Sequence, residues 1–436
     1  MYRQPCTVNR PPSTVKMHII AKQTIHLQIA PTVEEASIQH QWSELYWQDL
    51  LPEIDRLFTQ YCPNGEVWQI DQLELDLGHF QTGELRKEIL LPLLSQALEK
   101  WLSKQTGVPQ QIQKSPLPHR LFDQWLFYLK NGYLPWSLPQ LPENWEQSII
   151  ETLAKQTSAI ENLRDVLQEN LFAITRLIQQ HKAAFLQQVV ETYTTKKQGP
   201  LLPFIAQLPQ RKKQVTFWQG VIQLTIIKRK KLTSEILIQS YLKEEANFVV
   251  AENADALNEQ FKNPKSQIDQ QGIFTQIAGI VLVHFFLSRF FGKLDLLKSN
   301  DFKDAQARSK AVHLLYYLAT NQTEPDEVDL PLLKFLCGMP FNWPISPYIK
   351  LSEVELEEAD ALLQAVIHHW GALGKVSNAS LQQGFLNREG KLVQTDAGWR
   401  LVVEKSPIDV VLGQLPWGIG IVKLPWMEEP FKVEWV

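Results

Sequence analysis

Proline placement limits this 436-residue chain more than any other feature of its sequence. An interior proline removes a helical hydrogen bond and clashes with the preceding turn, so a long helix cannot run undisturbed through one. Prolines are dense from Pro109 to Pro142 and from Pro325 to Pro347, and no stretch without proline exceeds 60 residues. The sequence therefore predicts several helical segments and excludes one continuous rod.

Composition describes a globular chain with enough apolar residues for about two or three cores. The chain is 44% hydrophobic and 21% charged, with a formal net charge of -4. Its cysteines, Cys6, Cys62 and Cys337, are widely separated and show no CxxC spacing. This pattern argues against a disulfide framework or a zinc site and fits a reducing compartment. Residues 1–16 are polar, lack an apolar signal core and are predicted to form a disordered leader, so we expect synthesis in the cytoplasm.

One apolar stretch, Ile273 to Phe291, approaches the length of a membrane-spanning helix. Its interior holds Gln276, His284 and Arg289, and polar or charged side chains are costly at the centre of a bilayer. We therefore predict a buried core helix over residues 273–291 and no membrane span.

The segment 17–105 is predicted to form a small strand-helix-strand-helix unit. Its strands are Thr24–Ile29 and Leu73–Gly78, in which apolar and polar residues alternate. A helix lies between them, and a second helix is expected over Gly83–Lys104. The predicted core face of that second helix carries Ile89, Leu93, Ala97 and Trp101.

The stretch LELDLGHF, Leu73 to Phe80, allows two interpretations. Leucines alternate with Glu74 and Asp76, as they do in a half-buried strand with one solvated face. The same two carboxylates are also of the residue type that serves as a general acid and base. We favour the solvated face, because a catalytic pair needs surroundings that separate the two pKa values, and alternation alone does not supply them.

The rest of the chain is predicted to be helical until its last fifty residues. Residues 106–243 form a helical middle with short breaks, and residues 244–271, rich in Asn and Gln, form a polar linker. Residues 272–436 form a C-terminal helical domain with helices at Lys303–Thr320 and after a capping box at Ser352 and Glu355, followed by a hairpin and a β-rich tryptophan tail. The fold class is α+β, mainly α.

A basic region lies in the helical middle. Residues 192–234 contain no Asp or Glu. Their principal cations are Arg211, Lys212, Lys213, Lys228, Arg229, Lys230 and Lys231, joined by Lys196 and Lys197. Together with Phe217 and Trp218 they fit phosphate contacts and base stacking, an acidic protein surface, or a solvated helix face. Nucleic acid is the less favoured partner because the acidic remainder of the chain opposes steering.

Short signatures of catalysis are missing. The chain contains no GxxxxGK[ST], no GxGxxG after a strand, no GxSxG and no HExxH. His368 and His369 are adjacent and point about 100 degrees apart on a helix, so they do not form one metal site. We predict no enzyme activity, no cofactor and no catalytic or metal-ligating residue, and retain a hydrolase using Glu74 and Asp76 only as an alternative.

Several stretches occur in an order that is informative as a set. They are HIIAKQTIHLQI, IDQLELDLG, IAGIVLVHFFLSRFF, KAVHLLYYLATNQ, LLKFLCGMP and LPWGIGIVKLPWMEEPFKVEW. With them the chain resembles the tape measure proteins of contractile injection systems, the phage-tail-like particles that some bacteria build. The resemblance runs from about residue 18 to the end and depends most on the repeated Leu-Pro-Trp of the tail.

The resemblance implies a bacterial, non-catalytic assembly protein that contacts tube and baseplate subunits, helps to set tube and sheath length, and is incorporated into the particle or transiently associated with it. The resemblance also implies that LELDLG is a strand motif. In that motif Asp76 hydrogen-bonds the next turn, and Gly78 supplies a backbone angle that is costly for other residues. The family-motif or partner-contact residues are then Leu75, Asp76, Leu77, Gly78, Leu415, Pro416, Trp417, Leu424, Pro425, Trp426 and Trp435. Packing within the chain is the alternative for the tryptophans.

A ruler function conflicts with the proline pattern. One helical rod of this length would reach roughly 650 Å, and the proline clusters forbid it. The protein therefore defines a short structure, extends by unravelling, or acts in initiation. A scaffold or chaperone that holds tube, baseplate or effector subunits is the second hypothesis.

Overall fold

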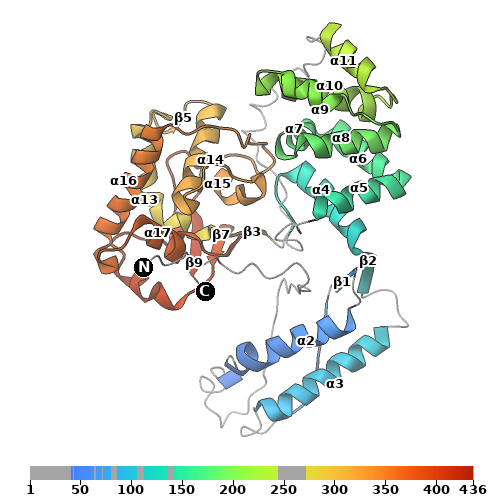
Figure 1. Cartoon of the computed structure of the whole chain (residues 1–436). Helices are drawn as coiled ribbons and strands as arrows, with labels where there is room; N and C mark the ends of the chain where they lie inside the picture. The colour runs from blue at the N-terminus through green and yellow to red at the C-terminus, as the bar shows by residue number, and fades with distance from the viewer. Residues whose placement is uncertain are drawn as a thin grey trace, which may run out of the picture. The chain divides into compact units, whose positions relative to one another are not determined.

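The structure is a computed structural model that describes residues 41–42, 44–62, 65–70, 72–79, 86–105, 112–135, 142, 144–243 and 272–435. The predicted leader, the strand Thr24–Ile29 and the linker 244–271 lie outside these residues. The chain divides into two compact units, Met1–Leu121 with Pro142–Trp145, and Phe122–Leu141 with Glu146–Val436. The described residues are mainly helical with a C-terminal sheet, which confirms the predicted fold class (Figure 1).

The first unit packs helices over short apolar clusters. In chain order it contains η1 (Tyr46–Leu50), α2 (Leu51–Tyr61), β1 (Glu66–Ile70), α3 (Lys87–Gln105) and β2 (Ile112–Pro116). The strands β1 and β2 pair antiparallel, from Glu66 opposite Pro116 to Ile70 opposite Ile112. α2 and α3 bury Leu57, Leu98 and Leu102 in one cluster, and η1 and α3 share a second.

The predicted strand at Leu73–Gly78 is wrong. The described residues 72–79 belong to no strand, and the strand of this region, β1, lies just before them. The alternation itself is real, since Leu75 and Leu77 are half-buried against the helices while Glu74 and Asp76 are exposed. Alternating burial is therefore produced here by packing on helices, without a pairing partner for the backbone.

The predicted core face of α3 is also wrong, by one residue. The buried column is Leu90, Leu94, Leu98 and Leu102, whereas Ile89 is exposed. The helix contains Pro92, and this rotation places the proline on the exposed side. Water can then solvate the carbonyl that a proline leaves without its helical donor.

The second unit contains the helical middle. α4 (Leu117–Asn131) runs into it from the first unit, and the following helices are α5 (Trp145–Lys155), α6 (Thr157–Glu169), α7 (Leu171–Gln180), α8 (Ala183–Thr194), α9 (Leu201–Gln207), α10 (Arg211–Ile222), η3 (Gln223–Ile227) and α11 (Ser234–Lys243). Polar residues separate the helices. Asn170, for example, caps α7 by accepting from Phe172 N at 2.9 Å and from Ala173 N at 3.3 Å.

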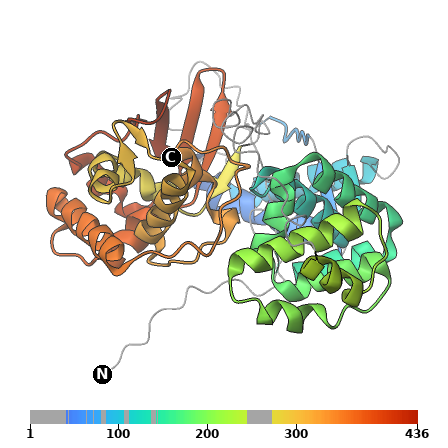
Figure 2. The same cartoon turned by 90° about the horizontal axis from the view of Figure 1, so that it is seen from above.

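The second unit ends in a set of helices and a five-stranded sheet (Figure 2). The helical elements are η5 (Ala278–Val283), α13 (His284–Lys293), α14 (Ala305–Thr320), η6 (Glu327–Asp329), α15 (Pro331–Leu336), α16 (Glu353–His369), η7 (Gly371–Leu373), α17 (Asn378–Leu381), η8 (Gln382–Leu386) and η9 (Pro407–Gln414). The strands are β3 (Ile273–Thr275), β4 (Leu297–Lys298), β5 (Asp301–Phe302), β6 (Gly390–Thr395), β7 (Gly398–Val403), β8 (Ile421–Val422) and β9 (Phe431–Trp435).

The large sheet has the order β3-β6-β7-β9-β8. The hairpin β6–β7 and the capping box of α16, in which Ser352 and Glu355 exchange hydrogen bonds, confirm two local predictions. β7 and β9 are parallel, and the other pairs in this sheet are antiparallel. Leu401, Val403, Phe431 and Val433 lie on the buried face of the sheet.

Most of residues 273–291 are buried as predicted, but they are not one helix. Ile273 begins β3, which pairs with β6, so its backbone bonds belong to a sheet. The tighter η5 follows, in which Gly279 lies against the Phe385 carbonyl too closely for any side chain. Across the described residues, no helix combines the length and apolar character needed to cross a bilayer.

A buried histidine links helices of the middle segment. Trp125 Nε1 on α4 donates to His181 Nε2 at 2.9 Å, which leaves His181 Nδ1 to donate to Leu177 O at 3.0 Å. The ring also stacks on Phe185. Burial lowers the pKa of His181 from 6.5 to about 4, so the folded protein holds a neutral imidazole.

We expect acid to destabilise the fold through His181. The unfolded chain binds a proton near pH 6.5 and the folded chain only near pH 4, so stability from this group is present above pH 6.5 and lost as the pH falls toward 4. The loss is at most about 1.4 kcal/mol per pH unit. Urea unfolding across this range should show a shallower pH dependence for His181→Gln, which keeps an acceptor for Trp125. Equal slopes in both proteins would contradict the assignment.

Candidate functional site

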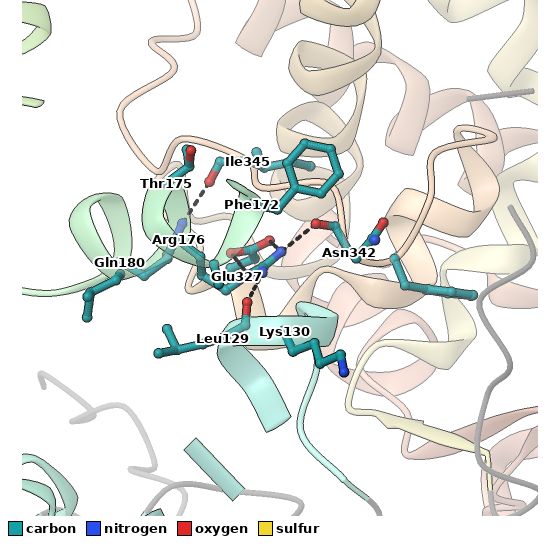
Figure 3. Close-up of polar contacts among 12 residues, drawn as sticks. Leu129, Lys130, Phe172, Thr175, Arg176, Gln180, Glu327, Asn342 and Ile345 are labelled. Atoms are coloured by element: carbon teal, nitrogen blue, oxygen red, sulfur yellow. Dashed lines mark hydrogen bonds and ion pairs between the residues drawn. The ribbon is translucent and has the colours of Figure 1, made fainter. Parts of the chain in front are cut away.

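A buried charge cluster joins the middle helices to the C-terminal part of the second unit. It consists of Arg176 on α7, Glu327 on η6 and Lys334 on α15, whose side chains have no exposed surface. Arg176 Nε donates to Glu327 Oε2 at 2.9 Å and Arg176 Nη2 to Oε1 at 3.2 Å. Lys334 Nζ donates to the same Oε1 (Figure 3 shows the arginine and its partners). One carboxylate therefore holds two cations.

Backbone carbonyls complete the charge cluster. Arg176 donates to Leu129 O on α4 and to Asn342 O at 2.7 Å, and Lys334 Nζ donates to Phe341 O at 3.0 Å. Gly132 has φ 78, and a Cβ atom on this residue would lie only 2.7 Å from Arg176 Nη2. A side chain at this glycine would displace the guanidinium, so the turn after α4 is shaped to admit it.

The environment of the cluster keeps Lys334 protonated and the neighbouring Tyr128 neutral. Burial lowers the pKa of Lys334 to about 8, while the Glu327 carboxylate limits that drop, so the ammonium stays protonated at neutral pH. Burial also raises the pKa of Tyr128 well above its usual range, and Glu327 adds to the rise. The three ions leave one excess positive charge inside the protein, which the carbonyl dipoles offset.

Sequence reasoning missed this cluster. The only signals were single charges inside apolar helices, Arg176 in LFAITRLIQQ and Lys334 in PLLKFL. Such a charge is rarely buried without a partner. The identity of the partner depends on contacts 151 residues apart in the chain, which spacing does not reveal.

Replacing Glu327 by Gln should strongly destabilise the second unit. The amide keeps the shape of the side chain but leaves two buried cations without their counter-ion, which costs about 3–5 kcal/mol. We expect this loss in the free energy of unfolding measured with urea. The matched control Glu324→Gln changes an exposed carboxylate three residues earlier and should stay within about 0.5 kcal/mol of wild type. Similar small losses in both variants would refute the role of the cluster.

The acidic motif shows local hydrogen bonding. Asp76 Oδ1 accepts from Gly78 N at 2.9 Å, and Gly78 has φ +88, as the two residues were predicted to behave. Glu74 accepts from Gln72 Nε2 at 2.6 Å. Both carboxylates are exposed, without the apolar enclosure that would separate their pKa values for acid and base roles.

The two Leu-Pro-Trp copies have different environments. In the second copy, Leu424 and Trp426 are buried, and Trp426 Nε1 donates to Leu336 O at 2.7 Å. In the first copy, Leu415 and Trp417 are half-buried, and Trp417 Nε1 donates to Leu282 O at 2.9 Å. Both prolines, Pro416 and Pro425, are exposed.

The first copy borders an exposed aromatic surface. The Trp417 ring stacks on Phe285, which is 66% exposed, and meets Phe286 edge to face. Trp435 is half-buried in β9, and its Nε1 has no hydrogen-bond partner among the described residues. Intramolecular packing therefore accounts for Trp426, while Trp417 keeps surface available to a partner.

Replacing each of the two Leu-Pro-Trp tryptophans by alanine should lower the free energy of unfolding by different amounts, because one ring is buried and the other is half-buried. Trp426→Ala removes a buried ring that packs on Phe291 and Phe302, with an expected loss of about 3–5 kcal/mol in unfolding free energy. Trp417→Ala removes one hydrogen bond and ring contacts at the surface, for about 1–2 kcal/mol. Urea titrations of both variants measure the difference, and equal losses would contradict it.

The predicted basic region forms two separate groups. Arg211, Lys212 and Lys213 begin α10, whereas Lys228 to Lys231 follow η3 at the other end of the same continuous helical run, about 25 Å away at 1.5 Å per residue. Arg211 is engaged with Tyr348, donating to its hydroxyl at 3.0 Å and lying over its ring. The region is therefore not one patch.

The aromatic residues of the basic region do not face solvent. Phe217 and Trp218 are 0% and 2% exposed, and the Phe217 ring packs against Phe204, Tyr241 and Trp218. The suggestion that they stack on bases is wrong, because α10 turns them into the core of the middle helices. Among the residues described, no group of three or more His, Cys, Asp or Glu side chains is placed to hold a metal ion.

Comparison with known proteins gives one finding. A family model described as contractile injection system tape measure protein matches residues 17–247 and, separately, residues 223–435. The two matches overlap at the end of the middle helices and together span both compact units. No curated protein and no solved structure matches the chain.

Proposed function

Because the chain belongs to the contractile injection system tape measure protein family, we propose that it works as a compact assembly component that initiates or organises the growing tube, and not as an extended ruler. The observation that carries this proposal is the buried charge cluster of Arg176, Glu327 and Lys334. Extending the chain would separate Arg176 from Glu327 and expose three ions that are now buried and bonded to one another. Such a separation is strongly unfavourable unless another partner compensates it.

Other contacts between the middle helices and the C-terminal part support a compact working form. Tyr133 belongs to the large C-terminal core and meets Phe341 edge to face. Phe172 contacts Trp343, and Gln180 Nε2 donates to Ile345 O at 2.7 Å. Unravelling would expose this apolar core as well as the ions, which water opposes.

The proposed partners are protein subunits of the tube and baseplate. The protein is made in the bacterial cytoplasm and then incorporated into the particle or transiently associated with it. The aromatic surface of Trp417 and Phe285 is one candidate contact, since large rings dominate interface energies when a partner buries them. A chaperone for unassembled subunits would use similar surfaces but would be missing from finished particles.

Insertions in the linker test the compact mechanism. We expect series of 7, 14 and 21 added residues within 244–271 to leave particle length and yield unchanged, because a segment predicted from its composition to be a linker should absorb added residues at little entropic cost. Electron microscopy of particles from producing cells measures the length. A linear increase of about 1.5 to 3.3 Å per inserted residue would establish a ruler instead.

Deletion of the gene is the reference for this series. We expect particles to be absent, reduced in number or altered in length in the deletion strain. Normal particles in that strain would overturn the assembly role itself, independently of the linker result.

A further inference from the structure

Six cations gather at one end of the middle helices. We call them the basic knob: Lys196, Lys197, Lys228, Arg229, Lys230 and Lys231. All six side chains are exposed. They come from two turns, the one that follows α8 and the one that follows η3. The sequence groups residues 228–231 with residues 211–213 in one basic region. In the structure they lie beside residues 196–198 instead.

The two turns of the basic knob are tied together by hydrogen bonds. Gln198, which has no exposed surface, donates through Nε2 to Leu232 O at 3.0 Å and to Thr194 Oγ1 at 3.1 Å. Lys196 Nζ donates to Lys231 O at 2.9 Å. These hydrogen bonds fix the position of one turn relative to the other. The cations therefore lie on an ordered surface.

Backbone conformation adds to this organisation. Thr195 has φ 57 and Arg229 has φ 56, so each turn contains a non-glycine residue in the left-handed region. Such residues cost free energy and persist where the surrounding contacts determine the backbone. After Arg229, Lys230 N donates back to Leu224 O and Thr225 O at 3.2 and 3.1 Å, which closes the turn.

Helix capping accounts for part of the basic knob only. α8 and the α10–η3 run both end here, and cations near carbonyl ends of helices are favourable. Lys196 is held instead by the carbonyl of Lys231, which lies beyond the end of η3. Lys197 lies 3.7 Å from Glu191. Lys228 is the C-cap residue of η3. Lys228, Arg229 and Lys230 pair with no carboxylate among the described residues, and their mutual repulsion is a cost that an external anion would remove.

We propose that the basic knob is a docking site for an acidic protein surface on a tube or baseplate subunit. This inference rests on the proposed assembly function. The aromatic residues nearest in sequence to the knob's second turn, Trp218 and Tyr241, are buried and offer no stacking surface for bases. The chain as a whole is acidic at -4, so beyond a Debye length it does not attract nucleic acid, whereas a pre-organised local surface suits short-range pairing with carboxylates.

A charge-reversal pair with a matched control tests the docking site. Lys228→Glu with Lys230→Glu changes the basic knob, and Lys182→Glu with Lys212→Glu makes the same charge change at the N-terminal ends of α8 and α10. Acids are favoured at helix N-termini, so the control should fold. Each variant is expressed in producing cells lacking the wild-type chain, and particles are counted by electron microscopy beside the deletion strain. Circular dichroism melts of the purified variants confirm folding.

The expected result is at least a tenfold loss of particles for the knob variant at wild-type melting temperature, with normal counts for the control. A photo-reactive amino acid replacing Lys231 in otherwise wild-type protein then identifies the partner. A cross-linked product that resists nuclease, and whose adduct peptide is rich in Asp and Glu, supports the proposal. Normal particles from the knob variant, equal losses in the control, or cross-links to nucleic acid or to no partner overturn it. Normal particles in the deletion strain would instead overturn the assembly function.

Discussion

The second unit depends most on the ion pairs that the buried Glu327 carboxylate forms with Arg176 and Lys334. The carboxylate accepts from Arg176 and from Lys334, and the arginine in turn donates to the backbone carbonyls of Leu129 on α4 and of Asn342. Apolar packing is non-directional and allows neighbouring helices to slide. A buried set of ions with fixed donors does not, because any slide leaves an unpaired charge. The charge cluster thus selects one arrangement of the middle helices on the C-terminal part.

The two proposed contact surfaces take their geometry from this fixed arrangement. The basic knob and the aromatic surface of Trp417 and Phe285 lie in the two parts that the charge cluster joins. Two separate contacts on one rigid body can fix the orientation of a bound subunit, which two contacts on an extensible chain cannot. A compact fold is therefore an advantage for an assembly component, and the proline clusters, which exclude a long rod, are consistent with it.

Local features of this fold were predictable and non-local ones were not. The capping box of Ser352 and Glu355, the helix at Ala305–Thr320 and the β6–β7 hairpin depend on residues close in sequence. By contrast, β1 needs residues 112–116 as its partner, and α3 is rotated by one residue because its leucine column meets two helices. The split of the basic region and the partner of Arg176 likewise follow from how helices pack, which periodicity does not specify.

The most direct test is a distance within the working particle. Spin labels at Glu169→Cys on α6 and Glu357→Cys on α16, in a Cys6→Ser and Cys62→Ser background, report the separation of the two parts that the charge cluster joins. Pulsed electron paramagnetic resonance should give the same distance distribution for the free protein and for protein bound in assembling particles. Drawing out the chain between the labels would carry them on the order of several hundred ångströms apart. Loss of the short distance on assembly would contradict the compact mechanism.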